Sequence, residues 1–154
     1  MRSRHCRRVE SESVFFHPLL SYIVENGETM LRDRILIIED DEFVRETIQL
    51  QLKKEKYQVL EAENGQEGIK VLLNGDNMEK VVLILCDLRM PIMSGEEFIK
   101  YLQELAPEMK VLVITGWPDV GLSDSLKAQG ADGFLTKPFE KQKLLETIKG
   151  LVAN

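Results

Sequence analysis

The sequence predicts a doubly wound α/β domain, in which helices cover both faces of a parallel sheet, from about Arg34 to the end of the chain. Apolar runs rich in Val, Ile and Leu occur at 35–38, 81–86 and 111–114, and such runs are typical of strands that are buried on both faces. Segments with apolar residues at helical spacing alternate with these runs. Each run also leads into polar residues, and ligands bind beyond the carboxyl ends of the strands in sheets of this class.

The first half of this region is predicted to contain two strands, two helices and two turns. The strands are expected at 35–38 and 57–60, and turn residues are expected at 64–65 and 74–77. The helices are identified by apolar residues at helical spacing, which are Val44, Ile48 and Leu52 in the first helix and Ile69, Leu72 and Leu73 in the second.

The second half of the region contains three strands and three helices. Strands are expected at 81–87, 111–115 and 133–136. Ser94 and Glu97 are spaced as a capping box at the start of the helix that follows the first of these strands. The helices are identified by Phe98, Leu102 and Leu105, by the segment 122–129 with Gly130 as its stop, and by Leu144, Leu145, Ile148, Leu151 and Val152. The prediction is therefore five strands and five helices.

Composition and charge restrict the function. The 154 residues are 44% hydrophobic and 30% charged, which fits one domain with a sizeable core plus an extension. Residues 1–33 contain five Arg and five acidic residues, so the formal charge of −6 comes from the other 15 basic and 21 acidic residues. Net acidity argues against direct nucleic-acid binding, and no apolar run approaches the roughly 20 residues that span a bilayer. Two cysteines, Cys6 and Cys86, do not make a disulfide framework, so a reduced, cytoplasmic protein is expected.

The first 33 residues do not follow the alternation and are expected to form an N-terminal extension to the domain at 34–154. The extension begins with four Arg among its first eight residues and continues with an apolar patch at 14–24. This order resembles a signal peptide, but His17 and Pro18 interrupt the patch and no small-residue cleavage pattern follows it. Two interpretations stay open. The extension is a segment that is disordered, packs on the domain or binds a partner, or it is an upstream reading of a chain that starts at Met30.

Acidic residues follow two of the predicted strands. Glu39 and Asp40 end the first strand, and Asp87 ends the third. If these strands are neighbours, three carboxylates converge, and like charges at short range raise one another's pKa unless a cation is bound. A site made only of oxygen ligands suits a hard cation such as Mg²⁺. Taken alone, the acidic run at 39–42 is equally consistent with a solvated helix start, where acids favour the helix dipole.

Two further polar residues close strands in the same way. Thr115 ends the fourth strand, and Lys137 follows the fifth. A lysine beside an acidic cluster pairs with it or binds phosphate as a point charge. Each residue alone is unremarkable, because Thr is frequent in turns at strand ends and Lys137 precedes the helix-entry residue Pro138. Together with the acids, each at the end of a strand, they form a strong composite signal.

At these residues the chain resembles the receiver domain of two-component response regulators, over about residues 34–154. The resemblance implies a flavodoxin-like fold, a five-stranded parallel sheet in the order 2-1-3-4-5 with the site at its carboxyl edge. It implies a phosphorelay switch rather than an enzyme, one that takes a phosphoryl group from a sensor histidine kinase or a histidine phosphotransfer protein and assists its own slow dephosphorylation. The switch is expected to stand alone, since nothing after Val152 could form a DNA-binding or enzymatic output domain. An unidentified downstream protein would bind the surface formed by the fourth helix, fifth strand and fifth helix. A homodimer stays open, and no membrane partner is expected.

The resemblance also implies roles for individual residues. Asp87 is the phosphoacceptor. The ligands of Mg²⁺ would be Asp40, Asp87 and the backbone carbonyl of Arg89, with Glu39 acting through water. The remaining positions are the switch hydroxyl Thr115, the phosphoryl-binding Lys137, the switch aromatic Phe134, and Pro138, which would follow a cis peptide bond.

Some positions depart from the commonest pattern of the family. Glu39 stands where the first acid is more often Asp, and Phe134 lacks the hydroxyl of the usual Tyr. Movement of Thr115 toward a phosphoryl group would vacate space into which Phe134 turns. Trp117 is bulky beside the site, and we expect Trp117 and Arg89 to limit water access and slow dephosphorylation.

Three other classes of function compete with this interpretation. A Mg²⁺-dependent phosphatase of the aspartyl-phosphate type usually has a second Asp two residues after the first, where this chain has Arg89. A flavin-binding or purely structural α/β domain would need a phosphate-cradling loop after the first strand, where four acids stand instead. The third is a receiver-like adaptor that acts without phosphorylation, and the intact key positions argue against it.

Overall fold

In the computed structural model of the chain, strands and helices alternate from residue 34 onward. The structure describes residues 22–25, 28–31, 34–116 and 121–153. The alternating elements are β3 (Arg34–Ile38), α1 (Glu42–Lys54), β4 (Gln58–Ala62), α2 (Gly65–Leu72), α3 (Asn77–Lys80), β5 (Val81–Asp87), α4 (Gly95–Leu105), β6 (Val111–Thr115), α5 (Leu122–Ala128), β7 (Gly133–Thr136) and α6 (Lys141–Val152).

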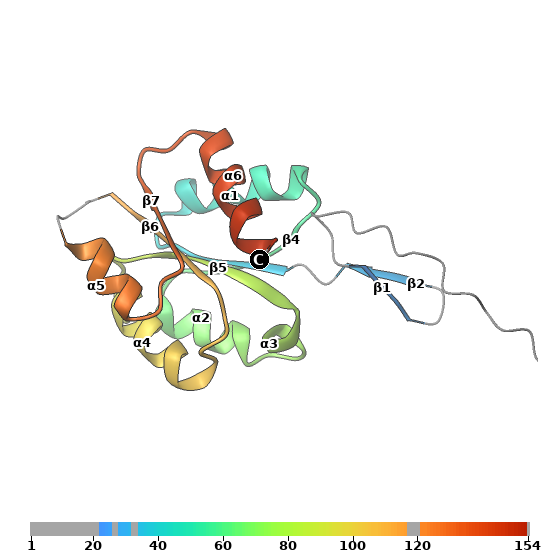
Figure 1. The fold of residues 1–154 in the computed structure, drawn as a ribbon, viewed down its shortest axis with the longest axis horizontal. Helices are drawn as coiled ribbons and strands as arrows, with labels where there is room; N and C mark the ends of the chain where they lie inside the picture. The colour runs from blue at the N-terminus through green and yellow to red at the C-terminus, as the bar shows by residue number, and fades with distance from the viewer. Residues whose placement is uncertain (1–21, 26–27, 32–33, 117–120, 154) are drawn as a thin grey trace, which may run out of the picture.

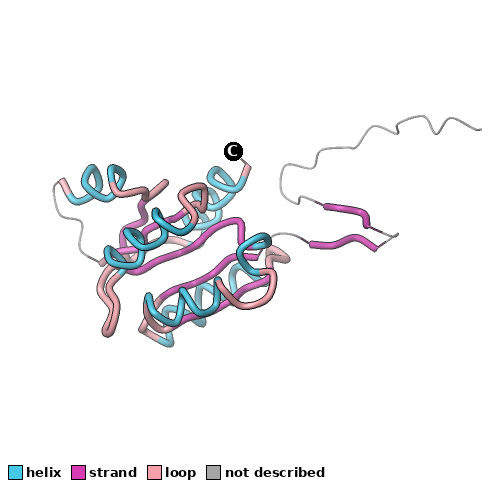
Figure 2. The backbone as a smooth tube through the Cα atoms, turned by 90° about the horizontal axis from the view of Figure 1, so that it is seen from below, coloured by secondary structure: helices cyan, strands magenta, loops and turns pink. Residues whose placement is uncertain are grey.

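The strands β3 to β7 form one parallel sheet in the order β4-β3-β5-β6-β7. With β3 counted as the first strand, this is the order 2-1-3-4-5 that the resemblance implied. Parallel neighbours need crossover connections, and here helices supply them. Figure 1 shows α1 and α6 on one face of the sheet and α2, α3, α4 and α5 on the other, and Figure 2 shows the strands between the two helical layers from a second side. The flavodoxin-like, doubly wound fold is confirmed.

The hydrophobic core has one half on each face of the sheet, because successive side chains of a buried strand point to opposite faces. The half beneath α2, α4 and α5 contains Phe98 and Val113. The half beneath α1 and α6 contains Ile48 and Ile148. Cys86 is fully buried in the strand β5, as predicted. This two-sided packing holds the ends of the strands, and therefore the polar residues that follow them, in fixed positions.

Polar caps set the starts of the helices near the site. Ser94 and Glu97 form the predicted capping box of α4. Asp41 is the N-cap of α1 and accepts a hydrogen bond from Val44 N at 3.0 Å. The acidic run therefore is a helix start in part, as one of the two interpretations held. Asn64, expected in a turn, is the N-cap of α2.

The expected count of five helices was wrong, because the described residues contain a sixth, the short helix α3, which directly follows the predicted turn, residues 74–76 being turn residues as expected. Asp76 forms ion pairs of 2.5 Å with both Arg34 and Lys80. The buried side chain of Asn77 donates to Val71 O at 2.6 Å. These contacts hold the single helical turn 77–80 against its neighbours, directly after the turn. None of the helices that the structure describes is long and apolar enough to cross a bilayer.

Two strands precede the main sheet. β1 (Tyr22–Glu25) and β2 (Glu28–Leu31) pair antiparallel in a sheet of their own. No strands were predicted here, although Asn26-Gly27 between two β-prone segments is a strong hairpin signal. The domain boundary at residue 34 stays a prediction. The expectations for residues 1–21 lie outside the described residues.

Candidate functional site

The carboxyl ends of β3 and β5 bring three carboxylates together. The two strands are parallel neighbours with Ile38 opposite Cys86, so Glu39 and Asp87 follow side by side. Carboxylate oxygens of Glu39, Asp40 and Asp87 all lie within 4.8 Å of one another. Glu39 and Asp87 are only 2% and 7% exposed, whereas Asp40 is open to solvent. The convergence expected from the sequence is present.

Lys137 reaches this acidic cluster from the loop after β7. Its Nζ lies 2.6 Å from Glu39 Oε2 and 3.7 Å from Asp87 Oδ2. Its backbone N–H donates to Thr115 O at 2.8 Å, which ties the loop to the end of β6. The peptide bond between Lys137 and Pro138 is cis, as the resemblance implied. Of the two roles left open for Lys137, pairing with acids is the one seen here, at short range with Glu39 and at longer range with Asp87.

The pKa values of both buried acids are raised. For Asp87 the largest cause is loss of hydration, and the charge of Asp40 adds to it, whereas Lys137 lowers the pKa. For Glu39 loss of hydration is again the largest cause, and the hydrogen bond from Lys137 opposes it. Three carboxylates thus face one ammonium group, and the excess negative charge favours a bound cation.

The donor chemistry of this cluster fits a hard divalent cation. All its side-chain ligands are carboxylate oxygens, which Mg²⁺ prefers to nitrogen and sulfur. The exposed Asp40 stands at the opening, so a cation that keeps several waters has room on the solvent side.

The loop after Asp87 is held close to that residue by backbone contacts. Leu88 N donates to Asp87 Oδ1 at 2.9 Å, and Gly95 N donates to Leu88 O at 3.0 Å. A Cβ at Gly95 would lie 2.2 Å from Asp87 O, so only glycine allows this approach. The loop therefore fixes the orientation of the Asp87 carboxylate and leaves Oδ2 facing Lys137.

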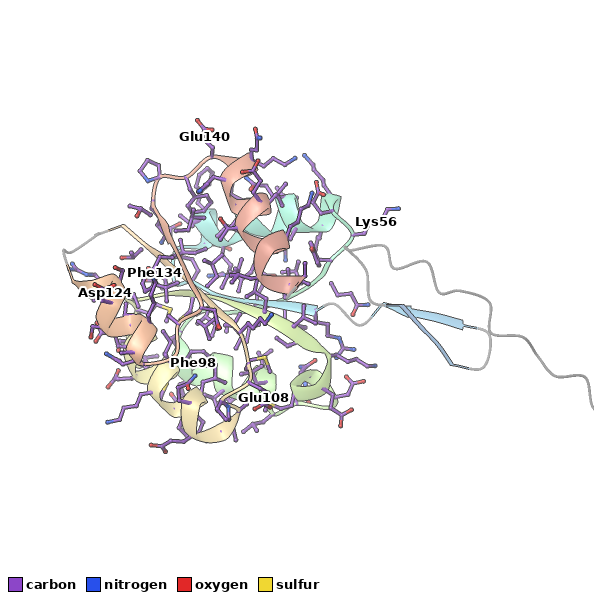
Figure 3. All side chains as sticks on the ribbon, viewed as in Figure 1. Lys56, Phe98, Glu108, Asp124, Phe134 and Glu140 are labelled. Carbon is purple, nitrogen blue, oxygen red and sulfur yellow. The ribbon has the colours of Figure 1, made fainter. Side chains whose placement is uncertain are left out.

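Thr115 and Phe134 lie on the neighbouring strands β6 and β7. Thr115 ends β6 and is buried. Phe134 is opposite Val113 in the register of the two strands, and Val113 and Thr115 point to the same face because strand side chains alternate. Phe134 is half-buried and packs against the core half that contains Phe98; both residues are labelled in Figure 3. A change at Thr115 can therefore reach the packing of Phe134.

Of the two residues expected to restrict water access, the structure describes one. The side chain of Arg89 is exposed. Trp117 lies outside the described residues. Their effect on dephosphorylation stays a prediction.

The sequence analysis missed a cavity of about 370 Å³ that opens beside Lys137. Its other lining residues are Phe43, Val44, Thr47, Ile48, Gln51, Pro138 and Phe139. Phe43 is 79% exposed. The sequence feature that could have indicated it is the helical position of Phe43. This residue lies off the apolar face of its helix, which Val44, Ile48 and Leu52 define.

Comparison with known proteins identifies this arrangement. The sequence profile of the response regulator receiver domain matches residues 35–149. The chain belongs to this family. The receiver is 36% identical over 114 residues to the transcriptional regulatory protein GlrR of Escherichia coli (strain K12), covering 74% of this chain and 25% of GlrR. It is 34% identical over 121 residues to the cell cycle response regulator CtrA of Brucella ovis, covering 77% of this chain and 50% of CtrA.

Solved structures agree with this assignment. The CheY-like receiver domain protein from Methanospirillum hungatei JF-1 matches with a TM-score of 0.71 and 32% identity, over 78% of this chain and 93% of that one. The present chain spans a quarter to a half of the length of the two curated relatives. Receiver domains are phosphoacceptor switches of two-component systems. They bind Mg²⁺ at an acidic pocket and interact with kinases or phosphotransfer proteins and with downstream targets.

Proposed function

We propose that this receiver accepts a phosphoryl group on Asp87 from the phosphohistidine of a sensor kinase or phosphotransfer protein, and that the surface formed by α5, β7 and α6 then changes. The observation that carries the proposal is a buried carboxylate at a strand end with two further acids and a lysine around it. The family explains why these residue types meet at this edge, and the geometry supplies a role for each.

Asp87 Oδ2 is the nucleophile in this proposal, because Oδ1 is engaged by Leu88 N and Oδ2 faces Lys137. Oδ2 forms a bond to phosphorus while the bond between phosphorus and the histidine nitrogen breaks in line with it. The imidazole leaves with the electron pair of that bond. Lys137 is close enough to exchange part of its pairing with Glu39 for a phosphoryl oxygen.

The site would hold Mg²⁺ through the carboxylates of Asp40 and Asp87 and the backbone carbonyl of Arg89, with Glu39 acting through water. When bound, the ion supplies positive charge for the phosphoryl oxygens. The raised pKa values of Glu39 and Asp87, caused first by loss of hydration and then by a neighbouring carboxylate, agree with this assignment, because a bound cation would offset both causes.

The new phosphoryl group gives the hydroxyl of Thr115 an acceptor at the end of β6. Movement of Thr115 toward it would open space beside Phe134 on the same face of the sheet. Phe134 packs on the core half that includes Leu126 of α5, so its rotation would shift α5. A downstream protein that binds the shifted surface completes the signal. Cytoplasmic location, dimerisation and action without an output domain stay predictions.

The first test is the intact mass of the chain after incubation with phosphoramidate, with and without Mg²⁺. We expect the wild type to gain one phosphoryl group only with Mg²⁺, and we expect Asp87→Asn to gain none. Asp132→Asn serves as the matched control, because Asp132 lies after β6 and outside the acidic cluster. A folded wild type that gains no phosphoryl group would reject the proposal in favour of the adaptor. A gain in Asp87→Asn would place the acceptor elsewhere.

A further inference from the structure

An apolar pocket lies between α1 and the loop after β7. It is the cavity of about 370 Å³ described above, and its lining includes Val44, Ile48 and Phe139. Phe43 lines it too and is 79% exposed, the highest fraction among the large hydrophobic side chains that the structure describes. An exposed apolar surface of this kind indicates that a contact covers it.

Exposed acids continue from this pocket to the proposed acceptor site. Residues 40–42 are three exposed acids directly before Phe43, and Glu46 is exposed one turn later on α1. Asp40 belongs to the acidic cluster of the site. A segment that covers both the pocket and this acidic surface would therefore combine apolar side chains with cations.

The first residues of the chain combine these two properties in one sequence. Residues 1–13 contain four Arg and two Glu, so their side chains carry a formal charge of +2. The apolar patch at 14–24 follows directly and includes Phe15 and Phe16. The domain at 34–154 carries the whole net charge of −6. The N-terminal segment and the surface of α1 are therefore complementary both in charge and in apolar character.

The hairpin β1–β2 places this segment within reach of the pocket. Tyr22 is opposite Leu31, so the chain before the hairpin begins about 10 Å from the start of β3, the length of three extended residues. β3 has five residues and is about 17 Å long, and α1 packs beside it. The residues 15–21 span about 23 Å when extended, so Phe15 reaches the middle of α1 and the residues before it reach the acids beyond.

We propose that the N-terminal segment of this chain, residues 1–21, folds back along α1, with Phe15 and Phe16 in the pocket and the arginines over the exposed acids. Apolar burial holds the segment at the pocket, and charge sets its direction along the helix. The docked arginines then stand at the opening of the acidic cluster, beside Asp40, and restrict access to Asp87. The docking is independent of the proposed function, whereas this restriction rests on it.

The N-terminal segment of a second copy suits the pocket less well. A segment of the same chain acts at a high effective concentration, because a short linker tethers it to the pocket. Docking between two copies would also bring two net acidic domains together, and these repel each other. The chain's own segment is therefore the occupant to which the observations point.

Paramagnetic relaxation enhancement in the full chain tests the docking. Cys86 is fully buried, so a nitroxide reagent attaches at Cys6, which lies among the arginines. We expect the amide signals of residues 42–45, the first turn of α1, to lose at least half of their intensity. The signals of α3, at the opposite edge of the sheet, should keep theirs. Cys6→Ser treated with the same reagent is the control for labelling.

Two single variants remove the apolar contact from its two sides. Phe16→Ser changes the segment, and Phe43→Ser changes the pocket. Each should restore the signals of residues 42–45, and high salt should weaken the effect of the nitroxide in the wild type, because it screens exposed charges. Leu73→Ser is the matched control, because Leu73 is 56% exposed and follows α2 in the other helical layer. This control should leave the loss of intensity in place.

Access to Asp87 is measured as the rate of labelling by phosphoramidate. We expect Phe16→Ser to be labelled at least threefold faster than the wild type, because the segment no longer holds its arginines at the opening. Leu73→Ser should be labelled at the wild-type rate. Failure of phosphoramidate to label the wild type would reject the proposed function, and the nitroxide measurement would still decide the docking.

Equal loss of intensity in α1 and α3, or no loss in either, would overturn the docking. Equal labelling rates of the wild type and Phe16→Ser would overturn the restriction of access. A mixture of isotope-labelled Cys6→Ser with nitroxide-carrying wild type at natural abundance separates the two sources of the segment. Loss of intensity in α1 in this mixture would assign the pocket to the segment of a second copy instead.

Discussion

At the scale of single residues, Asp87 and Glu39 are acids that the fold buries with too little positive charge. Burial and the charge of Asp40 raise the pKa of Asp87. An acid whose pKa is higher in the folded chain than in the unfolded chain is protonated more readily when folded. The contribution of Asp87 to the stability of the chain therefore falls as the pH rises from near 3.8 through its raised pKa, and this contribution stays at the lower level above that pH.

Replacement of Asp87 by Asn should therefore stabilise the chain without Mg²⁺. We expect the free energy of unfolding at neutral pH to rise by about 1 kcal/mol, because the amide removes a buried charge and keeps the shape. The gain should shrink as the pH falls toward 3.8 and the wild-type carboxyl is protonated. Urea unfolding over this pH range measures both effects, with Glu108→Gln as the control for loss of an exposed acid. A gain that grows at lower pH would contradict the argument.

The sequence indicated which residue types meet at the site but not how they pair. Glu39, Asp40, Thr115 and Lys137 each follow a buried strand, and parallel strands bring their carboxyl ends to one edge. Whether Lys137 pairs with Glu39 or with Asp87 depends on side-chain reach and loop geometry, which spacing along the chain does not encode. The positive φ of Ile92 was equally hidden, because tertiary contacts impose it against the residue's own preference.

At the scale of elements, the short helix α3 shows what a correct local signal leaves out, because the turn at 74–76 was predicted and the helix that follows it was not. The segment Asn74-Gly75-Asp76-Asn77 favours a turn by composition. In the folded chain Asp76 pairs with Lys80 within α3 and with Arg34 at the start of β3. Arg34 is distant in sequence, so a reading of the segment alone omits the contact that ties this helix to the sheet.

The ion pairs of Asp76 lead to a prediction on α3. The hydrogen bonds from Lys80 and Arg34 lower the pKa of Asp76 to about 2. An acid with a lowered pKa stabilises the fold above its unfolded pKa of 3.8, and this contribution is lost as the pH falls toward about 2. Carboxyl NMR titration should give a pKa of about 2 in the wild type and a value closer to 3.8 in Arg34→Gln.

The same titration includes its own check. Amide exchange of α3 should rise at the pH at which Asp76 gains its proton, and it should rise at a higher pH in Arg34→Gln. Gln58→Ala is the control, because Gln58 accepts a hydrogen bond from Arg34 but belongs to neither ion pair. This variant should leave the pKa of Asp76 unchanged. An Asp76 that titrates at 3.8 in the wild type would show that the two ion pairs do not persist in solution.

At the scale of the whole molecule, the parallel sheet with helices on both faces follows from the pattern of buried runs and crossover helices. The order of its strands was expected from the family resemblance alone. The hairpin β1–β2 was not predicted although Asn26-Gly27 signals it, because its first strand overlaps the apolar patch at 14–24 and the two-residue turn signal is weak beside that patch. A signal in two residues is easily overruled by a longer compositional pattern. The fold of the domain depends on many buried residues and was correspondingly easier to predict.

The helices of the domain are not equally anchored, and this bears on how a signal leaves the site. α1, α4 and α6 have 13, 11 and 12 residues, whereas α5 has seven, buries only Leu126 and begins at Gly121 with no side-chain cap. A short helix with few buried contacts shifts at lower cost in free energy than its neighbours. The helix α5, whose Leu126 belongs to the core half on which Phe134 packs, is thus held less firmly than α1, α4 and α6.

Phosphorylation of Asp87 should therefore change amide hydrogen exchange in β7 and α5 and leave α1 and α2 near their unphosphorylated rates. In Thr115→Val we expect the phosphoryl group to load on Asp87 while the change in β7 and α5 is lost, because valine keeps the buried volume but offers no hydroxyl to the phosphoryl oxygens. Thr136→Val is the matched control, since Thr136 lies opposite Thr115 in the register and is exposed. Exchange changes that persist in Thr115→Val would show that the signal reaches α5 by another route, with the Lys137 loop as the next candidate because its backbone joins Thr115 O.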